Sequence, residues 1–220
     1  MAGIGIKLNK FFDKGTVTGY LAGSGYSVVT TIAPMLLVIA DILAMQKILG
    51  YSDAAYGSRQ LFQATILYIF VFALLASAPL NAVLSRYVSD VIFNETYSDI
   101  MAAFHLGLWI SMAIDAIMVV PFAIHEYIVG GVDIVYVVTS VCCFIALSLV
   151  FYTMLYLSLC KDYGKISLFY FIGMAITLGI SYIFVKKFNM EITYSMLLAM
   201  TIGFIIIASL GYALLRQYFT

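Results

Sequence analysis

Residues 134–160 read IVYVVTSVCCFIALSLVFYTMLYLSLC, and none of them is charged. A helix of roughly 20 residues, rising 1.5 Å per residue, crosses a hydrocarbon core about 30 Å thick. The stretch does not alternate between apolar and polar residues, as a membrane β-strand does. Because backbone groups inside a bilayer must form hydrogen bonds within the protein, this run predicts a transmembrane helix.

Runs of the same kind recur along the whole chain. The composition is 64% hydrophobic and 10% charged with a mean hydropathy of +1.07, whereas a soluble domain carries about a quarter charged residues. The sequence therefore predicts an all-α membrane protein, with one six-helix transmembrane bundle over residues 21–220. The other expected spans are residues 26–45, 61–84, 101–124, 166–185 and 192–215.

Residues 1–20 precede the first span and differ from it in pattern. Apolar residues at positions such as Ile4, Leu8 and Phe11 share one helical face, with lysines beside it. This pattern is typical of an amphipathic helix in the membrane interface, and a plain positively charged anchor is the alternative.

The distribution of basic residues favours cytoplasmic N- and C-termini, since more lysines and arginines then fall on the cytoplasmic side of the membrane. The inner set is Lys7, Lys10, Lys14, Arg86, Lys161, Lys165 and Arg216, against Lys47, Arg59, Lys186 and Lys187 outside.

Two spans carry an aspartate. Asp41 follows Pro34 by seven residues and Thr30 by eleven, so the three lie on one stripe of the first helix. Asp115 lies near the middle of the third span, where a charged aspartate costs about 2.5 to 3.5 kcal/mol. We expect all four residues to serve a cavity or coupling function. The alternatives are that Asp41 reaches water at the membrane boundary and that Asp115 is protonated or bonded to a neighbouring helix.

Small and polar residues recur in the last two spans and favour close helix packing. They are Tyr170, Gly173, Thr177 and Ser181, followed by Gly203 and Gly211.

Several function classes are excluded by what the sequence lacks. It has no Walker loop, no cysteine or histidine cluster with metal-ligand spacing, and no serine and histidine placed as in intramembrane serine proteases. The net charge of zero offers no basic surface for nucleic acid. We expect neither an enzyme, nor a cofactor or metal site, nor a nucleic-acid partner.

Two stretches resemble one known family. MAGIGIKLNKFF at residues 1–12 and PLNAVLSRYVSDVIFN at residues 79–94 are similar to the start and to the end of the second span in the PelG family. The second stretch contains the pattern Arg-aromatic-Val-x-Asp, from Arg86 to Asp90. That family is the membrane component of bacterial Pel exopolysaccharide export, and it belongs to the multidrug, oligosaccharidyl-lipid and polysaccharide flippase superfamily.

The resemblance implies a transporter with two six-helix bundles around a cavity, of which this chain is similar to the N-terminal lobe of a MATE-like protein. A second lobe or a homodimer would complete it. It implies export of an amino-sugar polysaccharide for a biofilm across the bacterial cytoplasmic membrane, with a cytoplasmic glycosyltransferase and other Pel membrane proteins as partners. Pro34 and Asp41 would then mark a bending helix that faces the cavity.

On the same basis, Arg86 and Asp90 would form a cytoplasmic gate or a docking point for the glycosyltransferase. They are four residues apart, the spacing at which helical side chains can meet. Alternatively, Arg86 is only an anchor at the inner leaflet. Two other functions remain open for the whole chain: a cation-coupled antiporter for drugs or metabolites, and a scaffold for a polysaccharide synthase that does not itself transport.

Overall fold

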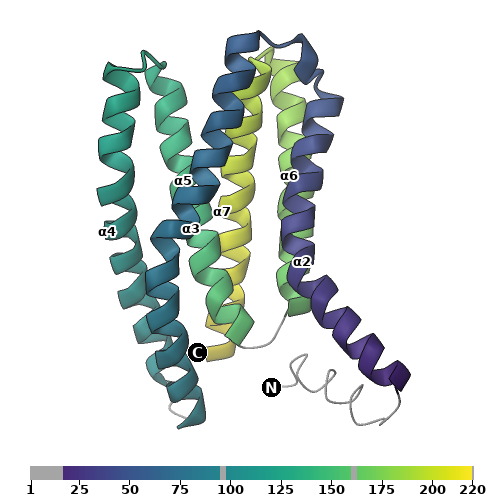
Figure 1. Ribbon diagram of the computed structural model, residues 1–220, viewed down its shortest axis with the longest axis vertical. Coiled ribbons are helices and arrows are strands. Elements are labelled where there is room, and N and C mark those ends of the chain that lie inside the picture. The colour runs from purple at the N-terminus through teal and green to yellow at the C-terminus, as the bar shows by residue number, and fades with distance from the viewer. Residues whose placement is uncertain (1–16, 95–97, 160–162, 220) are drawn as a thin grey trace.

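The computed structural model describes residues 17–94, 98–159 and 163–219. These residues form six α-helices and one short 3-10 helix, and they contain no strand (Figure 1). The elements in chain order are α2 (Val17–Ile48), η1 (Tyr51–Asp53), α3 (Tyr56–Phe93), α4 (Ser98–Ile128), α5 (Ile134–Leu159), α6 (Tyr163–Phe188) and α7 (Ile192–Phe219).

The all-α membrane fold predicted from hydropathy is confirmed. Five of the described helices, α3 to α7, are long and apolar enough to cross a membrane. The first predicted span, residues 26–45, lies inside the 32-residue helix α2, and its crossing of the bilayer stays a prediction. The predicted interfacial segment falls mostly on residues 1–16, which lie outside the described residues.

The helices extend beyond the predicted spans. The second span was expected to end at Leu84, but α3 continues to Phe93. Hydropathy marks only the part of a helix that suits hydrocarbon, whereas Val88 and Val91 remain buried in the core and keep the polar continuation helical. At about 1.5 Å per residue, the 38 residues of α3 reach far past a core of about 30 Å.

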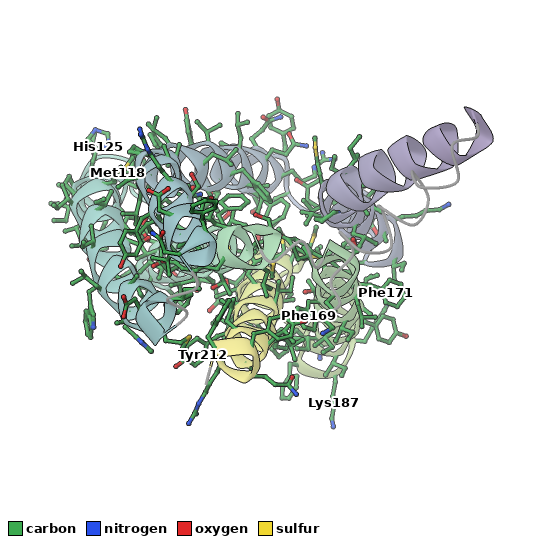
Figure 2. All side chains as sticks on the ribbon, turned by 90° about the horizontal axis from the view of Figure 1, so that it is seen from below. Met118, His125, Phe169, Phe171, Lys187 and Tyr212 are labelled. Atoms are coloured by element: carbon green, nitrogen blue, oxygen red, sulfur yellow. The ribbon has the colours of Figure 1, made fainter. Side chains whose placement is uncertain are left out.

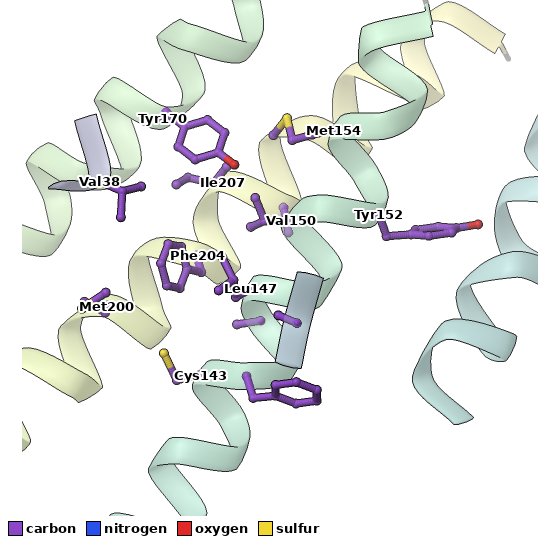
Figure 3. Close-up of a cluster of buried hydrophobic side chains, with 14 of the residues drawn as sticks. Val38, Cys143, Leu147, Val150, Tyr152, Met154, Tyr170, Met200, Phe204 and Ile207 are labelled. Carbon is purple, nitrogen blue, oxygen red and sulfur yellow. The ribbon is translucent and has the colours of Figure 1, made fainter. Parts of the chain in front are cut away.

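Helices α5 and α7 form the centre of the bundle and share its largest packing interface. On one side, α3 and α4 pack against α5; on the other, α6 packs against α7, and α2 packs against α6. Helices α2 and α4 therefore lie on opposite flanks, which the views of Figures 1 and 2 both show. In the close-up of the core, Val150 of α5 lies near Ile207 of α7 and Tyr170 of α6 (Figure 3).

Glycines bring α6 and α7 close together. A Cβ atom on Gly173 would overlap the Ile207 side chain, and one on Gly203 would overlap the Thr177 hydroxyl. The Thr177 hydroxyl donates a 2.9 Å hydrogen bond to the Gly173 carbonyl of its own helix. The predicted packing stripe of small and polar residues is thus confirmed at this contact.

Helix α2 bends, and its N-terminal part swings away from α6 (Figure 1). Pro34 lies inside this helix. A proline has no N–H to donate to the carbonyl four residues earlier, and its ring clashes with that carbonyl. Since sharp bends in helices almost always occur at such residues, Pro34 accounts for the bend.

Gly173→Ala tests the close approach of α6 and α7. We expect it to lower the free energy of unfolding by about 1–3 kcal/mol, because the added methyl group must displace Ile207. Gly179→Ala on the same helix is the control, since a Cβ there meets nothing within 4 Å. The control should be neutral or stabilise by about 0.5–1 kcal/mol. Thermal unfolding of both variants in detergent provides the measurement, and equal melting temperatures would contradict the packing described.

Candidate functional site

Asp115 lies in the interface between α4 and α5. It is 1% exposed, and neither carboxyl oxygen has a hydrogen-bond partner among the described residues. Ser111, one helical turn earlier on the same face, is also buried. Buried polar groups nearly always have hydrogen-bond partners, so a carboxyl group without one in an apolar bundle is a candidate for a functional role.

A polar group from the neighbouring helix, the hydroxyl of Ser148 on α5, lies close to Asp115. Ser148 is 0% exposed and lies close enough to Asp115 to affect its carboxyl group. The two side chains do not reach the distance and angle of a hydrogen bond, and the Ser148 hydroxyl also lacks a partner in the described part of the chain. Three buried oxygen atoms without partners thus face one another across the α4–α5 interface.

The row of buried residues that includes Asp115 and Ser148 continues along both α4 and α5. On α5, Tyr152 and Tyr156 follow Ser148 at four-residue steps, and on α4, Gly107 precedes Ser111 by the same step. A Cβ on Gly107 would overlap the Tyr152 hydroxyl, so the two rows face each other. We call this set the polar seam. It comprises Gly107, Ser111 and Asp115 of α4 with Ser148, Tyr152 and Tyr156 of α5, all of them buried.

The tyrosines of the polar seam are hydrogen-bonded, unlike its carboxyl group. Tyr152 points away from the α5–α7 core (Figure 3), and its hydroxyl donates to the Phe104 carbonyl at 2.8 Å. The Tyr152 and Tyr156 hydroxyls are 3.3 Å apart. Beside Phe104, the exposed His105 places Nε2 at 3.2 Å from the Tyr212 hydroxyl of α7. The seam therefore leads from Asp115 toward the end of the bundle where α5 and α7 end.

Asp41 occupies a similar environment on the opposite flank. It is 4% exposed on the helix that packs against α6, and its carboxyl oxygens have no partner among the described residues. Pro34, on the same helix, is half-buried. Thr30 lies in α2, but its side chain is outside the described set. Because α2 and α4 are on opposite flanks, the structure does not bring Asp41 and Asp115 together.

Arg86 and Asp90 lie in the last turns of α3, and both are exposed. Within the residues that the structure describes, no ion pair joins them, although their spacing permits one. Solvated side chains gain little from such a contact. They lie on the part of α3 that extends toward the turn into α4, at the end of the bundle where α7 also ends (Figure 1).

A cavity of about 460 Å³ lies between α3, α4 and α5. It begins at Met118, one turn beyond Asp115, and extends to Glu126 near the end of α4. None of the predicted site residues lines it. The described residues contain no group of three or more potential metal ligands.

Sequence reasoning missed Ser148, Tyr152 and Glu126. The four-residue spacing from Ser148 to Tyr156 was a usable signal, since it places three polar groups on one face of an apolar helix. No comparable signal indicated Glu126, because the cavity that it lines depends on how three helices diverge.

Comparison with known proteins gives one finding. A family model described as "PelG: Putative exopolysaccharide Exporter (EPS-E)" matches residues 1–220. Neither the curated proteins nor the solved structures gave a match.

Replacing Asp115, whose carboxyl group has no hydrogen-bond partner among the described residues, should affect stability differently from replacing Tyr152, whose hydroxyl group has one. Asp115→Asn should leave the melting temperature in detergent unchanged or raise it, because no described hydrogen bond is lost. Tyr152→Phe should cost about 1 kcal/mol, since it removes the bond to the Phe104 carbonyl. A large loss of stability in Asp115→Asn would mean that the carboxyl group has a structural partner.

Proposed function

The chain belongs to the PelG family, and from this premise we propose that it takes part in moving an amino-sugar exopolysaccharide across the bacterial cytoplasmic membrane. The match over residues 1–220 is the observation that carries the proposal. The multi-pass helical fold suits it, since five described helices can cross a bilayer. In this proposal both ends of the chain face the cytoplasm, as the distribution of basic residues favours.

Asp115 is the proposed coupling residue. A buried ionised carboxylate without a partner is costly, so gain or loss of a cation at this position changes the energy of the α4–α5 interface by a large amount. Such a change can favour one of two arrangements of the helices. Asp41 offers the same chemistry at the contact between α2 and α6, where Pro34 supplies a bend.

The bundle is proposed to act with a second six-helix unit, either a further lobe or another copy. Alternating access needs two bodies that move against each other around a substrate path. The flanks support such an arrangement, since large apolar side chains are exposed on α2 and α4, among them Met35, Leu43, Trp109 and Ile117. These side chains can contact either lipid or a second unit.

The projecting end of α3 is the proposed docking point for a cytoplasmic glycosyltransferase. Arg86 and Asp90 are exposed there, without an ion pair between them in the described part of the chain. A partner surface with complementary charges would be recognised mainly through such groups. In this way the polymer would be delivered directly from its synthase to the exporter.

Replacing Asp115 tests the transport proposal. Asp115→Asn should reduce polysaccharide export about tenfold, within the usual range of coupling free energies, while membrane abundance stays normal. Glu191→Gln, an exposed carboxyl group between α6 and α7, is the control and should export normally. Secreted polysaccharide and immunoblotted membranes provide the two measurements. If Asp115→Asn exports at the normal rate, the coupling role is wrong and a scaffold becomes the better interpretation.

Charge reversal tests the docking proposal. Arg86→Glu should weaken co-purification of the glycosyltransferase severalfold, since rim charges mainly govern association. The control is Lys187→Glu, which reverses an exposed charge labelled in Figure 2. Lys187 lies in the last turn of α6, and α6 ends at the other end of the bundle from the end of α3 (Figure 1). Recovery of the same amount of partner with Arg86→Glu as with the control would leave Arg86 as a membrane anchor only.

A further inference from the structure

The cavity between α3, α4 and α5 has the wrong chemistry for a saccharide. Its lining is mainly aliphatic and aromatic, including Met118 and Val119 at one end and Phe144 on α5. A sugar carries many hydroxyl groups, and each one that enters an apolar site without a partner costs free energy. The cavity is therefore suited to a different ligand from the exported polymer.

Hydrogen bonds within the protein already involve several of the polar groups in the lining. The Tyr136 hydroxyl donates to the Thr65 hydroxyl at 3.3 Å, which joins α5 to α3. The Ser140 hydroxyl donates to the Tyr136 carbonyl at 2.8 Å. These groups offer little to an incoming polar ligand, so binding in this part of the cavity must come from contact between apolar surfaces.

Glu126 is the one charged side chain among the residues that line the cavity. It follows Phe122 by one helical turn, and the Phe122 ring lies 5.9 Å from the rings of both Tyr68 and Phe72 on α3. The Glu126 side chain is 33% exposed, and its Oε1 lies 3.4 Å from Nδ1 of His125, which is more exposed. A carboxylate beside clustered aromatic rings is an arrangement that attracts organic cations.

We propose that this cavity binds an organic cation with an apolar body, the apolar part lying between α3, α4 and α5 and the positive charge lying near Glu126. The volume of about 460 Å³ is within the usual range of roughly 300–1,000 Å³ for small-molecule sites. The same chemistry has two sources in a membrane. One is a free lipophilic cation, and the other is an aminophospholipid whose acyl chain enters the cavity.

The test measures binding and does not depend on export. The purified chain, in an uncharged maltoside detergent, is dialysed to equilibrium against radiolabelled tetraphenylphosphonium. Ala64→Trp fills the cavity from an exposed position of α3 and should abolish saturable binding. Ala82→Trp, at an exposed position of α3 away from the cavity, is its control.

Glu126→Gln keeps the shape of the side chain and should weaken binding about fivefold, the upper range for a partly exposed charge pair. Asp133→Asn removes an exposed carboxylate from the loop after α4 and should bind as the wild type does. Phosphatidylethanolamine and phosphatidylglycerol are then added as competitors, since only the first carries an ammonium group.

Binding that both cavity variants weaken and that neither lipid displaces supports a site for free cations. Binding that both variants weaken and that phosphatidylethanolamine displaces better than phosphatidylglycerol supports an aminophospholipid site. The proposal is overturned if saturable binding is absent from the wild type, if Ala64→Trp binds as well as Ala82→Trp, or if Glu126→Gln binds as well as Asp133→Asn. Equal displacement by the two lipids also overturns it, because the positive charge would then not be recognised.

Discussion

The fold depends on one constraint: inside hydrocarbon, each polar group must find its partner within the protein. Most buried serine and threonine hydroxyl groups meet this constraint on their own helix. Thr139, Thr153, Thr177 and Thr201 each donate to the carbonyl four residues earlier, at 2.8–2.9 Å. Such local bonds let polar side chains enter an apolar bundle without depending on the neighbouring helices, so close packing of glycines and methyl groups can determine how α5, α6 and α7 meet.

Against that background, the groups that lack partners are conspicuous. Asp41, Asp115, Ser148 and Ser195 are buried as deeply as the threonines, yet their side-chain oxygens have no hydrogen bond among the described residues. Their presence cannot be explained by stability, since an apolar side chain of similar shape would cost less. A local violation of the packing rules is the mark expected of a functional position. Asp115 is a stronger candidate for a functional role than Asp41, because Ser148 lies close to it on another helix and both belong to the polar seam.

Hydropathy predicted the helices because hydrocarbon acts on each segment separately. It located the five helices that can cross a membrane, and two of them carry the buried residues Asp115 and, at the contact of α6 with α7, Gly173. The stripe of small and polar residues around Gly173, with Gly203 on the next span, predicted the close packing at that contact. Hydropathy could not predict features that depend on how two or three helices pack together. The pairing of Ser148 with Asp115 requires the register between α4 and α5, and the cavity requires the angle at which α3, α4 and α5 diverge. The spacing of Arg86 and Asp90 permits a contact, but among the described residues no ion pair joins them, in keeping with the small gain that exposed charges obtain from pairing.

Helix α4 links the two unusual regions of the molecule. Asp115 lies on it at the polar seam, and Met118, Phe122 and Glu126 form one wall of the cavity within the next three turns. The helix lies on the flank, packs against α3 and α5, and has only a small contact with α7. A shift of α4 relative to α5 would therefore change the surroundings of Asp115 and the shape of the cavity together, while the contact between α5 and α7 could remain as it is. Since a packed helix moves nearly as a rigid body, the proposed cation site and the proposed coupling role of Asp115 would be linked through this one helix.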